Sequence, residues 1–188
     1  IRENGSQNAI ISSESKSIEE LKELLSQAPN MKGLELASEV STKETYECGN
    51  GKYKVALIDY GVKKNIIRCL TERGCTVKVF PFDVSFEEIT GYSPDGIMLS
   101  NGPGDPSPLS GSIEVVKQLV NADYPIFGIC LGHQILSLSQ GLGTEKMHNG
   151  HRGINHPVKI LLPGRCEFPS QNHGFVVKRD DVENNSII

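Results

Sequence analysis

A cysteine enclosed by two glycines is the residue with the clearest potential for chemistry in this chain. Cys130 lies between Gly128 and Gly132, where an apolar run meets a stretch with helical spacing. Glycines at these positions permit the crowded strand-to-helix turn that presents a nucleophile, and the amides that begin the helix favour a thiolate and an oxyanion. A small buried cysteine in an ordinary turn would suit the same residues. This segment alone leaves both interpretations open.

A glycine-rich loop at residues 100–106, Ser-Asn-Gly-Pro-Gly-Asp-Pro, is the second candidate. Gly102 and Gly104 carry no side chains, so the amides of this loop can approach a ligand closely. If the loop neighbours Cys130, the N–H groups of Gly102 and Leu131 could together bind the oxyanion of a tetrahedral intermediate. The same composition also favours an ordinary structural turn.

Two further positions could contribute polar groups to a site around the cysteine. Gln134 follows Cys130 by about one helical turn, so its amide can face the same pocket. His133 is a poor candidate for a base, because a helical residue at this offset need not point at the sulfur. The segment 171–175, Gln-Asn-His-Gly-Phe, is polar and lies beside expected strands. It suits either a ligand-contacting hairpin or a plain turn.

Three histidines and five cysteines raise the question of a metal site or a disulfide framework. His148, His151 and His156 are irregularly spaced, with no carboxylate or thiol among them, so we expect hydrogen bonds that order a glycine-rich loop and no metal site. The cysteines are odd in number and lack the Cys-x-x-Cys spacing. A reducing compartment, and therefore the cytoplasm, is the expected location.

The composition is that of an ordinary globular protein. The chain has 188 residues, of which 37% are hydrophobic and 22% charged, and a formal net charge of −4. A mildly acidic chain without a basic stripe is not expected to bind nucleic acid. No apolar run approaches the roughly 18 residues that a membrane helix needs, so no membrane partner is expected.

The middle of the chain alternates short apolar strands with helical patterns, which predicts an α/β fold with an open, mostly parallel sheet flanked by helices. Ligands of such sheets bind at the carboxyl edge, so the loops after Leu99 and Ile129 should lie close together. Later short strands suggest an antiparallel extension. The expected strands are 55–58, 75–80, 96–99, 126–129, 157–162, 165–168 and 175–178, and the expected helices are 63–73, 86–89, 112–121 and 132–140.

The first part of the chain has a different pattern. Ser17 and Glu20 form a capping-box signature, which predicts an amphipathic helix over residues 17–27. A short helix is expected at 34–40. Residues 41–52 are polar and contain Gly-Asn-Gly, which is typical of a linker between two units.

These motifs together resemble the class I glutamine amidotransferases. The resemblance rests on Gly-Ile-Cys-Leu-Gly-His-Gln at 128–134 and on the loop 100–106. Asn-His-Pro-Val at 155–158 and the segment 171–175 narrow it to the branch of glutamine-hydrolysing small subunits of carbamoyl phosphate synthetases. A hydrolase of the dienelactone type shares such an elbow, but its fold does not call for the 171–175 motif.

The resemblance implies a mechanism and a set of site residues. Cys130 would attack the carboxamide of glutamine and form a thioester that water hydrolyses to glutamate. The amides of Gly102 and Leu131 would stabilise the oxyanion. The residues implied for binding the amino-acid part of glutamine are Gly104, Gln134, Asn172, Gly174 and Phe175.

The resemblance also implies partners and boundaries. Ammonia would pass to a large synthetase subunit that uses bicarbonate and ATP with Mg²⁺, so no cofactor or metal is expected in this chain. Residues 1–45 would be the end of an N-terminal domain, 46–52 a linker, and 53–188 most of the amidotransferase domain. The chain is expected to be truncated at both ends.

One departure from the family pattern leaves an alternative open. The family's general base is a histidine in a Gly-His-Pro-Glu-type motif, and nothing after Cys130 has that form. We expect this motif to lie outside the given sequence. The alternative is a non-catalytic module that binds glutamine or a partner and has lost its base, since acid–base help is worth roughly 10²–10⁴-fold in rate.

Overall fold

The computed structural model describes residues 2–160 and 164–183. The chain forms two compact units, each built from two separate parts of the sequence. The first, which we call the α/β unit, comprises Met31–Thr144 and, of its second part, residues 177–183. The second, the ribbon unit, comprises residues 2–30 and Glu145–Val176 without 161–163.

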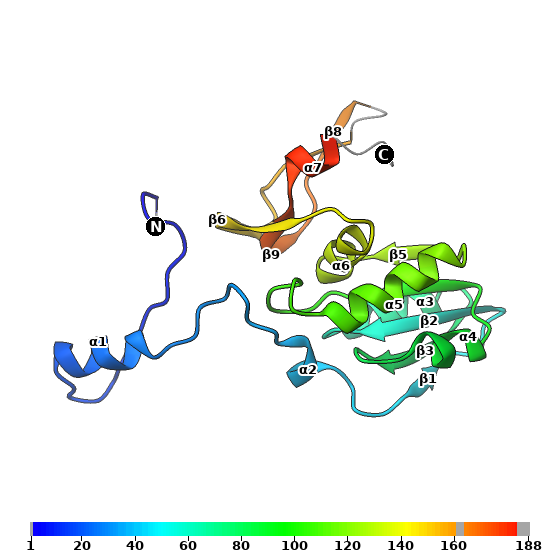
Figure 1. The fold of residues 1–188 in the computed structure, drawn as a ribbon, viewed down its shortest axis with the longest axis horizontal. Helices are drawn as coiled ribbons and strands as arrows, with labels where there is room; N and C mark the ends of the chain where they lie inside the picture. The colour runs from blue at the N-terminus through cyan, green and yellow to red at the C-terminus, as the bar shows by residue number, and fades with distance from the viewer. Residues whose placement is uncertain (1, 161–163, 184–188) are drawn as a thin grey trace. The chain divides into compact units, whose positions relative to one another are not determined.

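A five-stranded sheet with the order β1-β3-β2-β4-β5 forms the centre of the α/β unit (Figure 1). β2 (Tyr53–Asp59) lies between β3 (Cys75–Pro81) and β4 (Gly96–Leu99) and pairs with both in parallel. β5 (Ile126–Gly128) extends the sheet in parallel beyond β4, whereas β1 (Tyr46–Cys48) is antiparallel to β3. The predicted open, mostly parallel sheet is therefore confirmed.

Helices cover both faces of this sheet, as the alternation of strands and helices predicted. Neighbouring residues of a strand point to opposite faces, and Leu57 and Ile58 accordingly belong to different apolar clusters. Ile58 packs in the cluster that includes Val116 and Ile135, and Leu57 in the cluster that includes Ile67. The helices of this unit are α2 (Ala37–Val40), α3 (Lys64–Thr71), α4 (Phe86–Gly91), α5 (Ser110–Asn121), α6 (Leu131–Ser139) and α7 (Arg179–Glu183).

The strand register aligns the carboxyl ends of the central strands. Ile58 pairs with Leu99, and Leu99 pairs with Gly128, so β2, β4 and β5 end side by side. The loops that follow these strands therefore leave the sheet at one edge. The expectation that the loops after Leu99 and Ile129 lie close together is confirmed by the hydrogen bond from the Ile129 N–H to the Leu99 carbonyl oxygen at 3.0 Å.

Part of the polar segment that we interpreted as a linker is structured. Tyr46–Cys48 forms β1, and two of its three residues are exposed. The sequence therefore shows no apolar alternation that would have predicted this strand. Ser41 is buried, and its Oγ accepts a hydrogen bond from the Phe82 N–H at 3.0 Å. The Thr42 N–H donates to Asp59 Oδ2 at 2.8 Å. These contacts hold residues 41 and 42 against the sheet.

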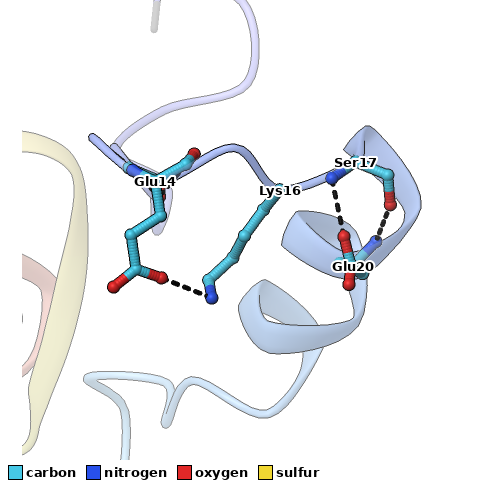
Figure 2. Close-up of polar contacts among 5 residues, drawn as sticks. Glu14, Lys16, Ser17 and Glu20 are labelled. Atoms are coloured by element: carbon cyan, nitrogen blue, oxygen red, sulfur yellow. Dashed lines mark hydrogen bonds and ion pairs between the residues drawn. The ribbon is translucent and has the colours of Figure 1, made fainter.

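The first part of the ribbon unit contains the helix that the capping-box signature predicted. α1 (Ile18–Ser26) begins after Ser17, whose N–H donates to Glu20 Oε2 at 2.7 Å while the Glu20 N–H donates to Ser17 Oγ at 3.2 Å (Figure 2). The hydrogen bonds from Ser17 to the carboxylate lower the pKa of Glu20. Figure 2 also shows the ion pair between Lys16 and Glu14, at 2.6 Å.

The rest of the ribbon unit consists of two pairs of strands. β6 (Thr144–Gly153) pairs with β9 (Gln171–Val177), and β7 (Val158–Ile160) pairs antiparallel with β8 (Arg165–Glu167). Much of the histidine-rich segment therefore forms a strand and not the loop that we expected. β9 also begins four residues earlier than the expected 175–178. Both β6 and β9 contain many polar residues, so their sequences lack an apolar period.

The predicted strand 157–162 is shorter in the structure, and its residues 161 and 162 lie outside the described part of the chain. Among the helices of the described residues, none is both long enough and apolar enough to cross a bilayer.

Candidate active site

Cys130 occupies a sharp turn between β5 and α6, where it caps the amino end of the helix. Its backbone angles are φ 53° and ψ −108°, a combination that residues with a side chain rarely adopt. Such a conformation costs of the order of 1–3 kcal/mol and persists only where the surrounding structure enforces it. Strain of this kind at a strand-to-helix turn is the geometry of a nucleophile elbow.

The two glycines around Cys130 are required by close backbone contacts. A Cβ on Gly128 would lie 2.6 Å from the His133 nitrogen, and a Cβ on Gly132 would overlap the Leu99 carbonyl and lie 2.6 Å from Leu99 Cβ. The first glycine lets α6 fold back over the end of β5. The second lets the helix approach β4 directly. The steric role that the spacing predicted for these glycines is therefore confirmed.

Backbone hydrogen bonds tie the elbow to the neighbouring strand end. The Gly132 N–H is shared between the carbonyl oxygens of Ser100 and Ile129, both at 3.0 Å, and the Gln134 N–H donates to the Cys130 carbonyl at 3.1 Å. Leu131 is the first residue of α6, so its N–H has no carbonyl partner within the helix. This amide is thus placed to bind an external acceptor.

The glycine-rich loop lies directly against the elbow within the α/β unit. A Cβ on Gly102 would overlap the Tyr60 carbonyl and lie 2.7 Å from Leu131 Cδ2. Ser100 is fully buried, and its Oγ accepts a hydrogen bond from the Tyr60 N–H at 2.9 Å. The structure thus brings Gly102 and Leu131 together, as an oxyanion site made of their amides would require.

Gly104 contacts a different part of the same unit. It has φ +89°, and a Cβ there would lie 2.7 Å from the Leu34 carbonyl oxygen. It forms an isolated bridge with Glu35. Asp105 is buried and accepts a hydrogen bond from the Gly33 N–H at 2.8 Å, so the loop is fastened to residues 33–36. A contact between Gly104 and substrate stays a prediction.

The charge environment of the elbow favours an anion. The first turn of α6 contains no acidic residue, so nothing in that turn offsets the positive end of the helix dipole beside Cys130. Partial desolvation lowers the pKa of His133, so its ring stays neutral more readily than a free histidine. Gln134 is buried on α6, four residues after the cysteine.

The remaining predicted binding residues belong to the ribbon unit. Asn172, Gly174 and Phe175 lie on β9, where Asn172 is exposed and Phe175 is buried. The Asn172 Oδ1 accepts a hydrogen bond from Arg152 Nη1 at 2.6 Å. Participation of these three residues in one site with Cys130 stays a prediction.

The histidines of the same unit form hydrogen bonds, as predicted from the sequence for His148, His151 and His156, but the cluster that two of them form with His173 and Gln171 was not predicted. His151 Nδ1 and His173 Nε2 each lie 2.9 Å from Gln171 Oε1, and the two ring nitrogens are 3.3 Å apart. The His156 ring stacks on His151 with centroids 4.6 Å apart. Among the residues that the structure describes, no group of three or more histidine, cysteine or acidic side chains is arranged to hold a metal ion. The spacing of residues 171 and 173, which places both side chains on one strand face, could have indicated the cluster.

An apolar groove of about 560 Å³ lies elsewhere in the α/β unit. α3, β4 and β5 line it with residues that include Ile66, Met98 and Phe127. The described residues that line this groove include none of the predicted site residues.

Comparison with known proteins gives a consistent result. The profile of the family described as "Glutamine amidotransferase class-I" matches residues 56–188. The carbamoyl phosphate synthase small chain of Pseudomonas syringae pv. tomato is 43% identical over 98% of this chain and 54% of its own length. The protein of the same name from Chlorobaculum tepidum is 45% identical over 97% of this chain and 51% of its own. The chain thus spans about half the length of these curated relatives.

A solved structure agrees with this similarity. A protein from Thermoplasma acidophilum, described as one of the subunits of a GMP synthase, superposes with a TM-score of 0.56 at 26% identity, covering 69% of each chain.

Proposed function

The chain belongs to the class I glutamine amidotransferase family, and on that basis we propose that it hydrolyses glutamine to glutamate and ammonia with Cys130 as nucleophile. One observation carries the proposal. Cys130 is held with φ 53° at the start of a helix, beside a loop whose Gly102 backbone packs against Leu131. A cysteine that only filled space would not need this strained backbone.

The proposed chemistry is a two-step acyl transfer. The Cys130 sulfur attacks the side-chain carbonyl carbon of glutamine, the carbon–nitrogen bond breaks, and the nitrogen leaves as ammonia after taking up a proton. Water then adds to the thioester and releases glutamate and the thiolate. Splitting one difficult hydrolysis into two easier steps is the usual advantage of covalent catalysis. No residue of the described chain is assigned the role of the base.

The amides of Gly102 and Leu131 would stabilise the negative oxygen that develops in both steps. Backbone donors that are fixed before the reaction need no reorganisation, and removing one such donor typically costs about 10²–10³ in rate. Gly104 and Gln134 of the α/β unit, with Asn172, Gly174 and Phe175 of the ribbon unit, would bind the amino-acid part of the substrate.

The names of the relatives support a more specific proposal. The chain would act as part of a carbamoyl phosphate synthase small subunit in the cytoplasm, with residues 53–188 belonging to its amidotransferase domain. Ammonia would pass to a large subunit that holds ATP and Mg²⁺, and this chain would carry no cofactor. The names do not favour the alternative of a non-catalytic binding module.

The test is a glutaminase assay on the full-length protein with its large subunit. Glutamate release should be lost in Cys130→Ser and kept in Cys69→Ser, which changes a half-buried cysteine of α3. A diazoketone analogue of glutamine should add a single label to the peptide that contains Cys130. Undiminished hydrolysis in Cys130→Ser, or labelling at another cysteine, would refute the proposal.

A further inference from the structure

Ser100, the residue after β4, is fully buried although its side chain is polar. Its backbone N–H donates to the Ile58 carbonyl oxygen at 3.2 Å, and its carbonyl oxygen accepts the Gly132 N–H at 3.0 Å. Its Oγ accepts the Tyr60 N–H at 2.9 Å and donates to the Asn101 carbonyl oxygen at 2.8 Å. A buried polar residue is stable where its groups are hydrogen-bonded in this way. Ser100 thus joins the end of β2, the glycine-rich loop and the elbow.

The hydroxyl of Ser100 acts on the peptide unit that carries the Gly102 N–H. The Asn101 carbonyl and the Gly102 N–H belong to one planar unit, and none of the described peptide bonds is cis. In a trans peptide unit, the carbonyl and the N–H point in opposite directions. The hydrogen bond from Ser100 Oγ to the Asn101 carbonyl oxygen therefore also sets the direction of the Gly102 N–H.

The two residues that flank this peptide bond are held by other contacts. Asn101 Nδ2 donates to the Gly61 carbonyl oxygen at 3.0 Å, and Asn101 Oδ1 accepts the Lys63 N–H at 3.0 Å. Gly102 is held by its close backbone contact with the end of β2. These contacts position the two Cα atoms but leave the peptide unit between them able to rotate, because glycine adopts φ values of either sign. The Ser100 hydroxyl selects one of these orientations.

We propose that Ser100 is a positioning residue, whose hydroxyl turns the Gly102 amide toward the oxyanion of the reaction. The inference rests on the proposed function, because glutamine hydrolysis is the reaction that forms this oxyanion. The same residue also supports the second donor, since its carbonyl oxygen accepts the Gly132 N–H, directly after Leu131. All of these residues belong to the α/β unit, so the arrangement does not depend on the other unit.

Ser100→Ala tests the inference, because it removes the hydroxyl and leaves the backbone bonds of the residue in place. In the glutaminase assay on full-length protein with its large subunit, kcat should fall by about 10²-fold, the loss that a misplaced catalytic group can cause. The value of kcat/KM should fall by the same factor, as expected when an interaction made only in the transition state is lost.

Ser41 provides the matched control. It is buried in the same unit, and its Oγ accepts the Phe82 N–H at 3.0 Å and donates to the Thr42 carbonyl oxygen at 3.3 Å. Ser41→Ala therefore deletes the same pattern of hydrogen bonds at a position outside the elbow and its loop. Both variants should lose stability in urea unfolding, but Ser41→Ala should keep the kcat of the protein without substitutions.

Alkylation of Cys130 by iodoacetamide separates orientation of the oxyanion donor from damage to the elbow. Displacement of iodide by the sulfur forms no oxyanion, so the labelling rate of the Cys130 peptide should be unchanged in Ser100→Ala. If Ser100→Ala does not fold, Ser100→Cys replaces it, since a thiol is similar in size but a weak hydrogen-bonding group. It should likewise lower kcat and leave the labelling rate of Cys130 unchanged.

The possible outcomes distinguish this inference from the proposed function. An equal loss of kcat and of the Cys130 labelling rate would mean that Ser100 only supports the fold of the elbow, and would overturn the inference. So would an undiminished kcat in Ser100→Ala, or in Ser100→Cys where that variant is used, while the proposed function would stand. Absence of glutamine hydrolysis in the protein without substitutions would overturn the proposed function and the inference with it.

Discussion

Backbone strain at Cys130 can be measured as a difference in stability between two substitutions. The residue has φ 53° and ψ −108°, where a side chain conflicts with the backbone and glycine does not. Cys130→Ala removes the sulfur and keeps the conflict. Cys130→Gly removes both. The stability difference between the two variants therefore reports the strain and excludes the effect of losing the thiol.

The expected magnitude follows from two opposing effects. Residues held in sparsely populated backbone regions cost about 1–3 kcal/mol. Glycine in place of alanine ordinarily costs about 0.5–1 kcal/mol, because the unfolded glycine chain has more freedom to lose. Cys130→Gly should therefore be more stable than Cys130→Ala, by roughly 1 kcal/mol within a range of about 0–2.5 kcal/mol.

Cys69 provides the matched control. It lies inside α3, where the backbone is helical and carries no such strain. Cys69→Gly should be less stable than Cys69→Ala by about 1 kcal/mol. The two pairs should thus differ in sign, and the gap between them measures the strain at the elbow directly.

Urea unfolding of the four variants gives the free energies of unfolding, provided that the slopes of the transitions agree. The full-length protein is used without substrate, so loss of activity does not affect the comparison. If glycine destabilises position 130 as much as position 69, the elbow is unstrained. The backbone strain at Cys130, on which the proposal of a nucleophile elbow rests, would then be refuted.

Two further predictions concern the loop and the first helix. Gly102→Ala should lower kcat in the glutaminase assay by about 10²–10³. The reason is that the new Cβ would overlap the Tyr60 carbonyl and displace the loop. Gly111→Ala is the control and should leave kcat unchanged, because no atom lies within 4 Å of a Cβ at that position. Because the pKa of Glu20 is lowered, its ionised carboxylate should stabilise α1 fully at pH values above the ordinary glutamate pKa of 4.5. This stabilisation should be lost as the pH falls through the lowered pKa. Amide hydrogen exchange of α1 should show this loss, and Glu20→Gln, which has no carboxyl to titrate, should not.

The parallel sheet and the elbow were predictable because their signals are local. Strands such as Tyr53–Asp59 are largely buried on both faces and therefore read as continuous apolar runs. The glycines at 128 and 132 act within a few residues of Cys130, so their spacing carries the geometry of the turn. The capping box at Ser17 is local in the same way.

The parts that escaped prediction depend on contacts between distant residues. β1 is exposed along most of its length and pairs with β3 roughly thirty positions later, so its own residues carry no apolar signal. β6 and β9 are polar ribbons, and each unit combines segments from separate parts of the chain. The contact of Arg152 with Asn172 joins residues 20 positions apart. The residue pattern within β6 or within β9 does not indicate this contact.

The same close contacts that pack the elbow also set the positions of the two proposed oxyanion donors. Gly132 lets α6 rest on Leu99, which fixes the first turn of the helix and with it the amide of Leu131. Gly102 lets its loop rest on Tyr60 and on the Leu131 side chain, which fixes the other amide. Neither donor can move without opening a packed backbone contact, so the geometry exists before a substrate binds. A side chain at either glycine would disturb packing and catalysis together, and these two effects should not be separable by substitution at these positions.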